Sequence, residues 1–356
     1  MTEEQLAQKY RAQAEMLGNR VRKRFKHLHR RYARQNIEAF RLYDWEIPEI
    51  RAAVDWYAGH LVVAEYVRRQ STPEWLPRMG EAVAAALGVP PEKVHLKRRF
   101  TGGGDGPRYE RLAATEEKIV VREGDLSFRV NLNDYVDTGL FPDHRNTRRM
   151  VRELAAGRDF LNLFCYTGTF TCHAAKGGAR RTVSVDRSET AILWARENMA
   201  LNGIPEAGNT LVHCDTFDFL EQAARDGVSF DLAVVDPPSF STRREVRQNP
   251  EAAFDVAVDH PELLDRVLRL MRKGGVVFFS TNHQQFVPRM NGLAASEVEE
   301  ITEKTLPEDY VNKRKRIHRC WRIVAWPGSG DRAAPPGRPG LRPEDPTDTG
   351  CSRGCR

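Results

Sequence analysis

Cysteine and long apolar stretches are both scarce in this chain of 356 residues. The six cysteines form no C-x-x-C pair and show no zinc-finger spacing, so we predict reduced thiols and no metal site. No apolar run approaches the roughly 18 residues that a membrane-spanning helix needs, and the first residues lack the apolar core of a secretory signal. We therefore expect a cytoplasmic protein with no membrane partner.

Two phosphate-binding motifs are also missing. The chain contains no G-x-G-x-x-G after a predicted strand, which disfavours a dinucleotide, and no G-x-x-x-x-G-K-[ST], which disfavours a nucleoside triphosphate. What the chain does have is an excess of positive charge, +6 with a pI near 9.0. This charge is compatible with a polyanionic partner but does not require one.

Composition divides the chain into four predicted parts. Residues 1–36 form a basic helix, residues 37–130 a small α+β domain that contacts RNA, residues 131–326 the main domain, and residues 327–356 a disordered tail rich in proline and glycine. The helix carries "RVRKRFKHLHRRYAR", in which clustered cations predict phosphate contacts, although a solvated helix face is an equally good interpretation. The predicted RNA-binding residues of the helix are Arg22, Lys23, Arg24 and Lys26.

A second basic segment lies in the small domain. Lys97, Arg98 and Arg99 end a predicted strand, next to Phe100 and the loop 101–110 that contains Tyr109. Bases interleaved with aromatic residues are typical of nucleic-acid contact. A mobile surface hairpin explains the same pattern, so both interpretations stay open.

From residue 134 onward, short apolar runs alternate with helical segments. The predicted strands are 159–164, 181–186, 210–214, 230–235 and 275–280. This alternation predicts an α/β fold with a doubly wound, Rossmann-like parallel sheet. In such sheets the ligand lies outside the carboxyl ends of the strands.

The residues that follow these strands predict the ligand. Gly168 is the only glycine in the turn "CYTGTFT" before the next helix, and Asp186 ends the second strand, where an acid suits ribose hydroxyls. Asp215 follows the third strand and suits an adenine amine, and Asp236 opens "DPPSF" after the fourth. A ribose, an adenine and no phosphate together indicate S-adenosylmethionine as cofactor.

At this point the chain resembles a known family. The segments that carry the resemblance are "NRVRKRFKHL", "RLYDWEIPE", "AVDWYAGHLVVAEY", "NDYVDTGLFPDHRNTRRM", "DFLNLFCYTGTFTCHAAKGGAR", "ENMALNG", "DPPSFS", "AFDVAVDH" and "NKRKRIHRCW". They are similar, in order, to the RlmK module of the bifunctional 23S rRNA methyltransferase RlmKL, a class I S-adenosylmethionine-dependent RNA methyltransferase. The guanine-N2 methyltransferase half that precedes this module in the bifunctional enzyme is not in this chain, so we expect a stand-alone RlmK-like protein.

The resemblance implies methylation of guanine N7 in 23S rRNA or a large-subunit precursor. It also implies a set of cofactor-binding residues around the carboxyl ends of the strands. These are Phe141, Asp143, Arg145, Phe164, Tyr166, Thr167, Gly168, Asp186, Asp215 and Asp236. Arg145 has a second interpretation, a cation at the start of a helix.

The residues themselves leave three possible target atoms for the methyl group. Carbon-5 methylation of cytosine needs a cysteine nucleophile, and "FFSTNHQQF" has none. Methylation of guanine N2 typically uses an aromatic residue after Asp-Pro-Pro, where this chain has Ser239. Guanine N7 needs only alignment with the methyl group. We predict catalytic roles for Asp236, Pro237, Phe240 and Asn282, and keep an inert RNA-binding relative as the non-enzymatic alternative.

Overall fold

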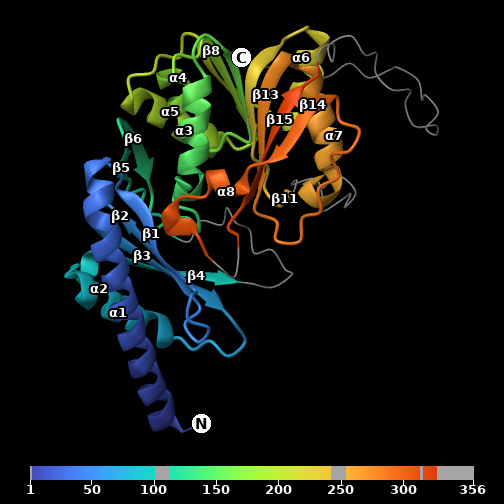
Figure 1. Ribbon diagram of the computed structural model, residues 1–356. Coiled ribbons are helices and arrows are strands. Elements are labelled where there is room, and N and C mark those ends of the chain that lie inside the picture. Colours follow the sequence, from blue (N-terminus) through green and yellow to red (C-terminus); the bar gives the residue numbers. More distant parts are fainter. Residues whose placement is uncertain (1, 101–112, 242–253, 313–315, 327–356) are drawn as a thin grey trace, which may run out of the picture.

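The computed structural model describes residues 2–100, 113–241, 254–312 and 316–326, and it contains two principal β-sheets (Figure 1). The smaller sheet belongs to the N-terminal part of the chain and the larger one to the rest. The predicted loop at 101–110 and the predicted disordered tail at 327–356 lie outside these described residues. No helix in the described ranges is long and apolar enough to cross a membrane.

The basic N-terminal segment is helix α1 (Glu3–Arg34). It begins with a capping box, in which the Thr2 hydroxyl accepts from the Gln5 backbone N–H while the Gln5 side chain accepts from the Thr2 backbone N–H. One stripe of the helix, including Leu17 and Leu28, is fully buried against the small sheet. Helix and sheet therefore share one hydrophobic core, although the sequence places a boundary at residue 36.

The small sheet has the order β1-β2-β3-β4. Its strands are β1 (Ala39–Asp44), β2 (Ala52–Tyr57), β3 (His60–Val67) and β4 (Val94–Phe100). β3 and β4 pair in parallel, and their connection contains α2 (Trp75–Leu87) and the short helix η1 (Pro91–Lys93). Gly88 caps the end of α2 with a left-handed φ of 68°, a conformation that glycine adopts readily.

The large sheet has seven strands in the order β14-β15-β13-β10-β7-β8-β9. Its strands are β7 (Asp159–Leu163), β8 (Arg181–Asp186), β9 (Asn209–His213), β10 (Phe230–Val235), β13 (Met271–Thr281), β14 (Ala295–Glu300) and β15 (Arg319–Ala325). The first five run parallel and coincide with the predicted strands, which confirms the doubly wound α/β fold. β15 is antiparallel to β13 and β14.

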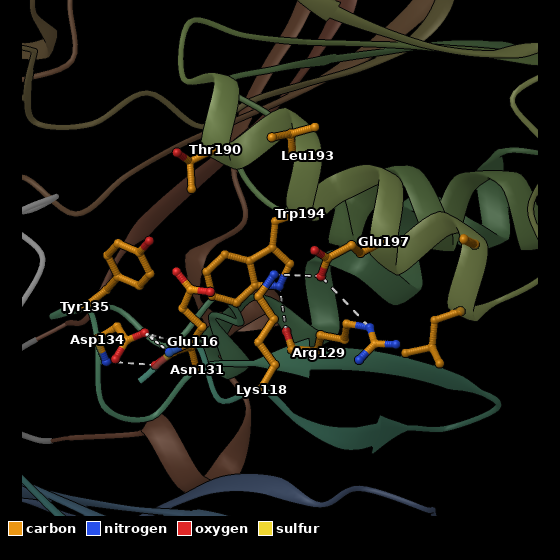
Figure 2. A pocket seen from close by; sticks show the side chains of 12 residues that line it. Glu116, Lys118, Arg129, Asn131, Asp134, Tyr135, Thr190, Leu193, Trp194 and Glu197 are labelled. Carbon is orange, nitrogen blue, oxygen red and sulfur yellow. Dashed lines mark hydrogen bonds and ion pairs between the residues drawn. The ribbon is translucent and has the colours of Figure 1, made fainter. Parts of the chain in front are cut away.

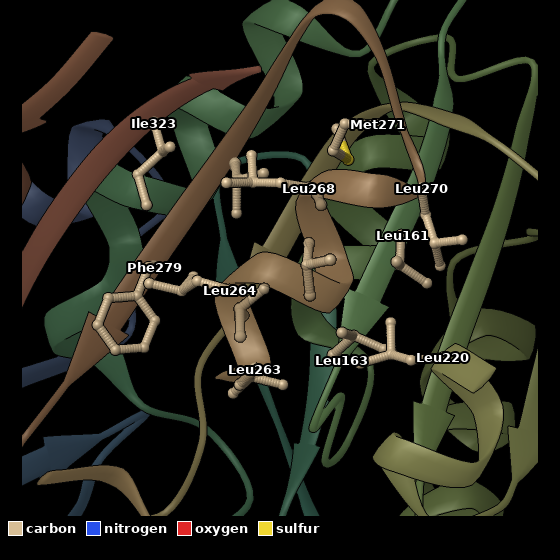
Figure 3. Close-up of a cluster of buried hydrophobic side chains, with 14 of the residues drawn as sticks. Leu161, Leu163, Leu220, Leu263, Leu264, Leu268, Leu270, Met271, Phe279 and Ile323 are labelled. Atoms are coloured by element: carbon tan, nitrogen blue, oxygen red, sulfur yellow. The ribbon is translucent and has the colours of Figure 1, made fainter. Parts of the chain in front are cut away.

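Helices cover both faces of this sheet, as the chain order of a doubly wound fold requires (Figure 1). They are α3 (Arg145–Leu154), α4 (Thr169–Lys176), α5 (Glu189–Leu201), α6 (Thr216–Arg225), α7 (Val256–Arg269) and the short α8 (Thr302–Thr305). Because both faces are covered, the central strands are apolar along most of their length. Figure 3 shows Leu161 and Leu163 of β7 packed with Leu263 and Leu264 of α7 on one face.

Several short elements complete the described fold. The hairpin β5 (Ile119–Glu123) and β6 (Leu126–Val130) packs against α5, where Asn198 and Asn202 accept its backbone N–H groups. The remaining pieces are η2 (Pro142–His144), η5 (Glu308–Tyr310), β11 (Phe240–Ser241) and β12 (Phe254–Asp255). Of these, η2 and η5 lie where the two sheets meet, since η5 contacts β1 and η2 leads into α3.

Candidate active site

The turn after β7 has an unusual backbone. Phe164 and Tyr166 have positive φ values of 56° and 47°, and Gly168 follows with 71°. Such values cost a non-glycine residue about 1–3 kcal/mol each and persist where the surroundings enforce them, commonly at ligand-binding sites. Alternating left-handed residues also turn backbone N–H groups toward a common concavity. The backbone therefore marks this turn as a candidate binding site.

Gly168 is required by packing as well as by its φ. A Cβ at this position would lie 2.8 Å from the Cβ of Ala195 on α5, which is closer than side chains approach. The glycine thus lets the turn lie directly on α5. Thr167 secures the same turn, because its hydroxyl donates to the carbonyl of Gly139 at 2.6 Å and its own carbonyl accepts from Asn198.

Asp186 lies beside this turn at the end of β8. One carboxylate oxygen accepts from the backbone N–H of Tyr166 at 2.9 Å and the other from that of Ser188 at 2.8 Å. Each oxygen has a second lone pair that suits a hydroxyl donor. Burial raises the pKa of Asp186 above its ordinary value.

Phe141 borders the same turn from another element, and Asp215 lies just after the strand β9. Phe141 is 38% exposed and its ring lies 5.5 Å from that of Tyr166. Asp215 is the N-cap of α6, where its carboxylate accepts from the backbone N–H of Phe217. The structure thus brings Phe141, Tyr166 and Asp186 together, and Asp215 follows the neighbouring strand β9.

Two hydrogen bonds join the loop that follows β10 to the end of β13 and the residue after it. The hydroxyl of Ser280 donates to Asp236 at 2.6 Å, and the hydroxyl of Ser239 donates to the side-chain oxygen of Asn282 at 2.6 Å. The second bond leaves the amide nitrogen of Asn282 available as a donor. Pro237 is buried between them, and of Phe240 only the backbone, in β11, is described.

A buried histidine lies behind Asp236. His144 Nε2 is 3.5 Å from the second carboxylate oxygen of Asp236, and the His144 ring stacks on His318 at 4.4 Å. Both ring nitrogens of His318 form hydrogen bonds, Nδ1 with the Asp143 carboxylate at 2.8 Å and Nε2 with the Thr305 hydroxyl at 3.1 Å. The polar atoms of Asp143, His144 and His318 lie within 4.8 Å of one another, the spacing of a possible metal site. Because both His318 nitrogens already have protein partners, we assign the cluster as a buried support behind Asp236.

Buried histidines make the folded state sensitive to acid. Burial lowers the pKa of both His144 and His173 below the ordinary 6.5, even though Asp236 and Glu123 lie near them. Below pH 6.5 the unfolded chain therefore binds protons that the folded chain excludes. Unfolding free energy should fall by up to about 1.4 kcal/mol per pH unit for each histidine as the pH drops from 6.5. Urea unfolding at pH 7.5 and 5.5 measures this loss, and H173Q should show a smaller loss than the parent chain. Equal stability at both values would contradict the prediction.

Arg145 makes its contacts at the junction of the two sheets. Its guanidinium donates to Asp309 at 3.1 Å and to the carbonyl of Ala39 at 2.8 Å, and it lies over the ring of Tyr32. These contacts join α3 to α1, β1 and η5. Arg145 is therefore a buried cation at the junction of the two sheets. This position agrees better with a cation at the start of a helix than with a contact to the methionine end of the cofactor. Asp143 is also buried, with its carboxylate turned to His318.

Lys97 does not occupy a position from which it can bind RNA. It is 3% exposed and donates to the carbonyls of Tyr135 and Val136, because β4 turns this side chain toward the main domain. Burial lowers the pKa of Lys97 to about 8. Arg98 remains 43% exposed, near Glu65 at 3.7 Å. The prediction of an RNA contact was therefore wrong for Lys97.

The four cations predicted on α1 divide into two pairs. Arg24 donates to the carbonyl of Glu308 at 2.8 Å, and Arg22 donates to the carbonyl of Ala86 and to Asn19. Lys23 and Lys26 are exposed and form no ion pair within the described part of the chain. They lie three residues apart, on one face of the helix.

A large pocket lies outside this group of residues. It has a volume of about 1030 Å³ and lies between the β5–β6 hairpin, the loop after β6 and α5 (Figure 2). Lys118 lies 2.6 Å from Glu197, and its ammonium is 4.7 Å from the ring centre of Trp194. Trp194 separates the pocket from the turn after β7, with Tyr166 6.2 Å away. The pocket contains none of the predicted site residues, and its cations are already paired.

Comparison with known proteins identifies the family. Residues 41–299 match the family model of S-adenosylmethionine-dependent methyltransferases. The chain is 41% identical over 313 residues to ribosomal RNA large subunit methyltransferase K of Neisseria meningitidis serogroup B, covering 86% of each chain. The chain belongs to the methyltransferase K family. This chain is also 44% identical to ribosomal RNA large subunit methyltransferase K/L of Pseudomonas putida. The match covers 87% of this chain and 42% of the relative, so this chain spans less than half the length of that protein.

Solved structures agree with the fold of the methyltransferase K family. SMU.776, a methyltransferase solved with bound SAH, superposes with a TM-score of 0.66 at 23% identity, covering 86% of this chain and 82% of its own. A S-adenosylmethionine-dependent methyltransferase from Streptococcus mutans gives 0.67 at 22% identity, covering 88% and 81%. At these identities the likeness concerns the fold.

S-adenosylmethionine is the cofactor of this methyltransferase K family member, and the donor set of the site fits it. Asp186 offers partly buried acceptors to ribose hydroxyls, the strained turn at Phe164 and Tyr166 offers backbone groups to the amino-acid end, and Phe141 offers an exposed ring. The individual assignments remain proposals. Sequence reasoning did not single out His144, Ser280 or His318, since only folding brings them to Asp236.

Proposed function

We propose that the protein methylates guanine N7 in 23S rRNA, using S-adenosylmethionine. The relatives that share 41–44% identity are named as ribosomal RNA large subunit methyltransferases, which supports rRNA as the substrate. Exposed Lys23 and Lys26 on α1, together with Arg98, supply cations for its phosphates. The choice of N7 rests on the loops after β10 and β13.

The orientation of Asn282 carries the proposal for N7. Ser239 donates to the Asn282 side-chain oxygen, so the amide presents N–H donors to a bound base. The edge of guanine that contains N7 offers two acceptors, N7 and O6. A donor beside O6 would hold the base with N7 toward the methyl group. An exocyclic amine such as N2 needs acceptors instead, which this amide does not offer.

The chemistry at N7 needs no proton transfer. Bound S-adenosylmethionine supplies a methyl group on a positively charged sulfur. The N7 lone pair forms the new bond to carbon as the sulfur–carbon bond breaks, so the positive charge moves to the guanine ring and no proton leaves. In this role the Asp236 carboxylate, fixed by Ser280, stabilises the cation that develops on the base.

Cysteine chemistry has little support at this site. Cys165 and Cys172 are buried, and burial raises the pKa of both thiols above the ordinary value of 9.0. A thiol with a raised pKa is a poor nucleophile at neutral pH. Both also follow β7, on the cofactor side, whereas Asn282 and Asp236 follow β13 and β10. Carbon-5 methylation of cytosine is therefore the weaker alternative.

Methylation of purified rRNA tests the target atom. The protein, S-adenosylmethionine and large-subunit rRNA from a strain that lacks the gene should yield a new chain break after borohydride and aniline treatment, which cleaves at N7-methylguanosine. N282A should lower the yield of this product, whereas the exposed-residue control D218N should not. Methyl incorporation without any new break would refute N7 and favour another atom of rRNA.

A further inference from the structure

A second charged pocket lies at the opposite end of the large sheet. It has a volume of about 370 Å³ and is formed where β7, β8 and β13 begin. Asp186 and Asp236 follow the other ends of the strands, and β8 alone spans about 20 Å at 3.3 Å per residue. The pocket is therefore separate from the candidate active site.

Part of the charge in this pocket is internally balanced. Arg272 lies 2.7 Å from Asp231 and 2.9 Å from the buried Asp159, and Arg180 lies 2.7 Å from Asp159. These ion pairs fix the start of β7 against the start of β13. They leave no surplus acid for the remaining cations of the pocket.

Arg158 and Lys273 are the cations without an acidic partner. Within the described part of the chain neither forms an ion pair, and the Nη1 atom of Arg158 is buried with no hydrogen-bond partner. A buried donor left unsatisfied costs about 1–3 kcal/mol. Lys273 is exposed at the mouth of the same pocket. An anion between the two would satisfy the first and be attracted by the second.

The rest of the wall is open backbone. Gly157 and Gly274 have φ values of 70° and 73°, and a Cβ at either position would meet no atom within 4 Å. No side chain therefore obstructs the approach of a group carried on a larger molecule. Arg180 is 59% exposed beside them.

We propose that this pocket binds a phosphate group of the rRNA backbone. The proposal rests on the proposed function, because it takes RNA as the substrate. The arginine fork matches two phosphate oxygens, and lysine adds a point charge. Because the pocket is at the far end of the sheet, it extends the RNA footprint beyond the small domain and around the methyltransferase domain.

Binding of a large-subunit rRNA fragment, measured against salt concentration, tests the proposal. The variants are R158Q with K273Q, K273Q alone, and R225Q as a control whose guanidinium is exposed on α6. We expect the double variant to weaken RNA binding on the order of fivefold and to lower the salt slope by about one. K273Q, at an exposed position, should give part of both effects, R225Q none, and S-adenosylmethionine binding should stay unchanged throughout.

The outcomes separate this proposal from the proposed function. Unchanged RNA binding in K273Q and in the double variant would overturn the phosphate site. If the variant K23Q with K26Q weakens RNA binding in the same assay, the proposed function on RNA stands. If the chain does not bind rRNA at all, both fail. Inorganic phosphate is the second probe: a thermal shift with it that vanishes in K273Q, without any change in RNA binding, would assign the pocket to a free phosphate and overturn the RNA assignment.

Discussion

Replacing Asp236 with alanine should reduce methyl transfer to rRNA by a factor of about 10²–10³, the usual effect of removing one fixed electrostatic group from a transition state. The carboxylate is anchored by Ser280 at 2.6 Å and backed by His144 at 3.5 Å, so it is in place before the base arrives. D236N keeps the shape and loses the charge. If charge stabilisation is its role, D236N should be nearly as slow as D236A.

Methyl transfer from labelled S-adenosylmethionine at saturating rRNA measures this loss. Cofactor affinity, measured by calorimetry, should fall much less than the transfer rate, because Asp186 and the turn after β7 make the larger share of the proposed cofactor contacts. The matched control is D218N, which removes an exposed acid on α6. Full transfer by D236A would remove Asp236 from the site.

Replacing Arg148 with methionine should destabilise the fold by about 3–5 kcal/mol, because it leaves a buried carboxylate without its partner. The Arg148 side chain is 1% exposed and donates to both oxygens of Glu123, at 2.7 and 2.6 Å. A third donor bonds the carbonyl of Phe141 at 2.9 Å. Burial alone would raise the pKa of Glu123, but the charge of Arg148 and the hydrogen bonds from His173 and Arg148 together outweigh burial and hold the pKa below the ordinary value.

The neighbouring Arg149 is the matched control. Its side chain is 66% exposed and lies 3.8 Å from Glu153 one helical turn away, so R149M should change unfolding free energy by less than about 0.5 kcal/mol. Chemical unfolding measures both. The double variant R148M with E123Q should recover part of the loss, since it removes the unpaired charge. Equal stability of R148M and R149M would show that the buried pair contributes nothing.

Arg148 also couples stability to the site. It holds the carbonyl of Phe141, whose ring lies beside Tyr166. The same variant should therefore weaken cofactor binding under conditions where it remains folded. In the described structure Arg149 contacts neither Glu123 nor Phe141, so R149M is also the control for the measurement of cofactor binding.

The sequence by itself determined the architecture of the main domain. Apolar runs at the five parallel strands are local patterns, and each predicted strand coincides with an observed one because a strand buried on both faces must be apolar. Gly168 in the turn after β7 was likewise predictable, because glycine adopts a left-handed φ without strain. The family was also predictable, because its motifs are contiguous segments.

Only the tertiary structure decided which charged side chains are exposed. Lys97 and Arg98 are adjacent in sequence, yet one is buried against Val136 and the other is in solvent, because neighbours on a strand point to opposite faces. In the sequence, nothing distinguishes Arg145 from the other cations of its segment. In the fold, its charge is paired with Asp309, which lies far along the chain. Composition gives the number of cations, whereas their partners depend on long-range packing.

The strands β14 and β15 and the support behind Asp236 also needed the fold. β14 has the sequence ASEVEE, which contains no apolar run, and it pairs in the sheet with β15. His144 and His318 are 174 residues apart and stack on each other only in the folded chain. Local patterns therefore determined the scaffold and the cofactor, and contacts between distant segments determined the environment in which Asp236 acts.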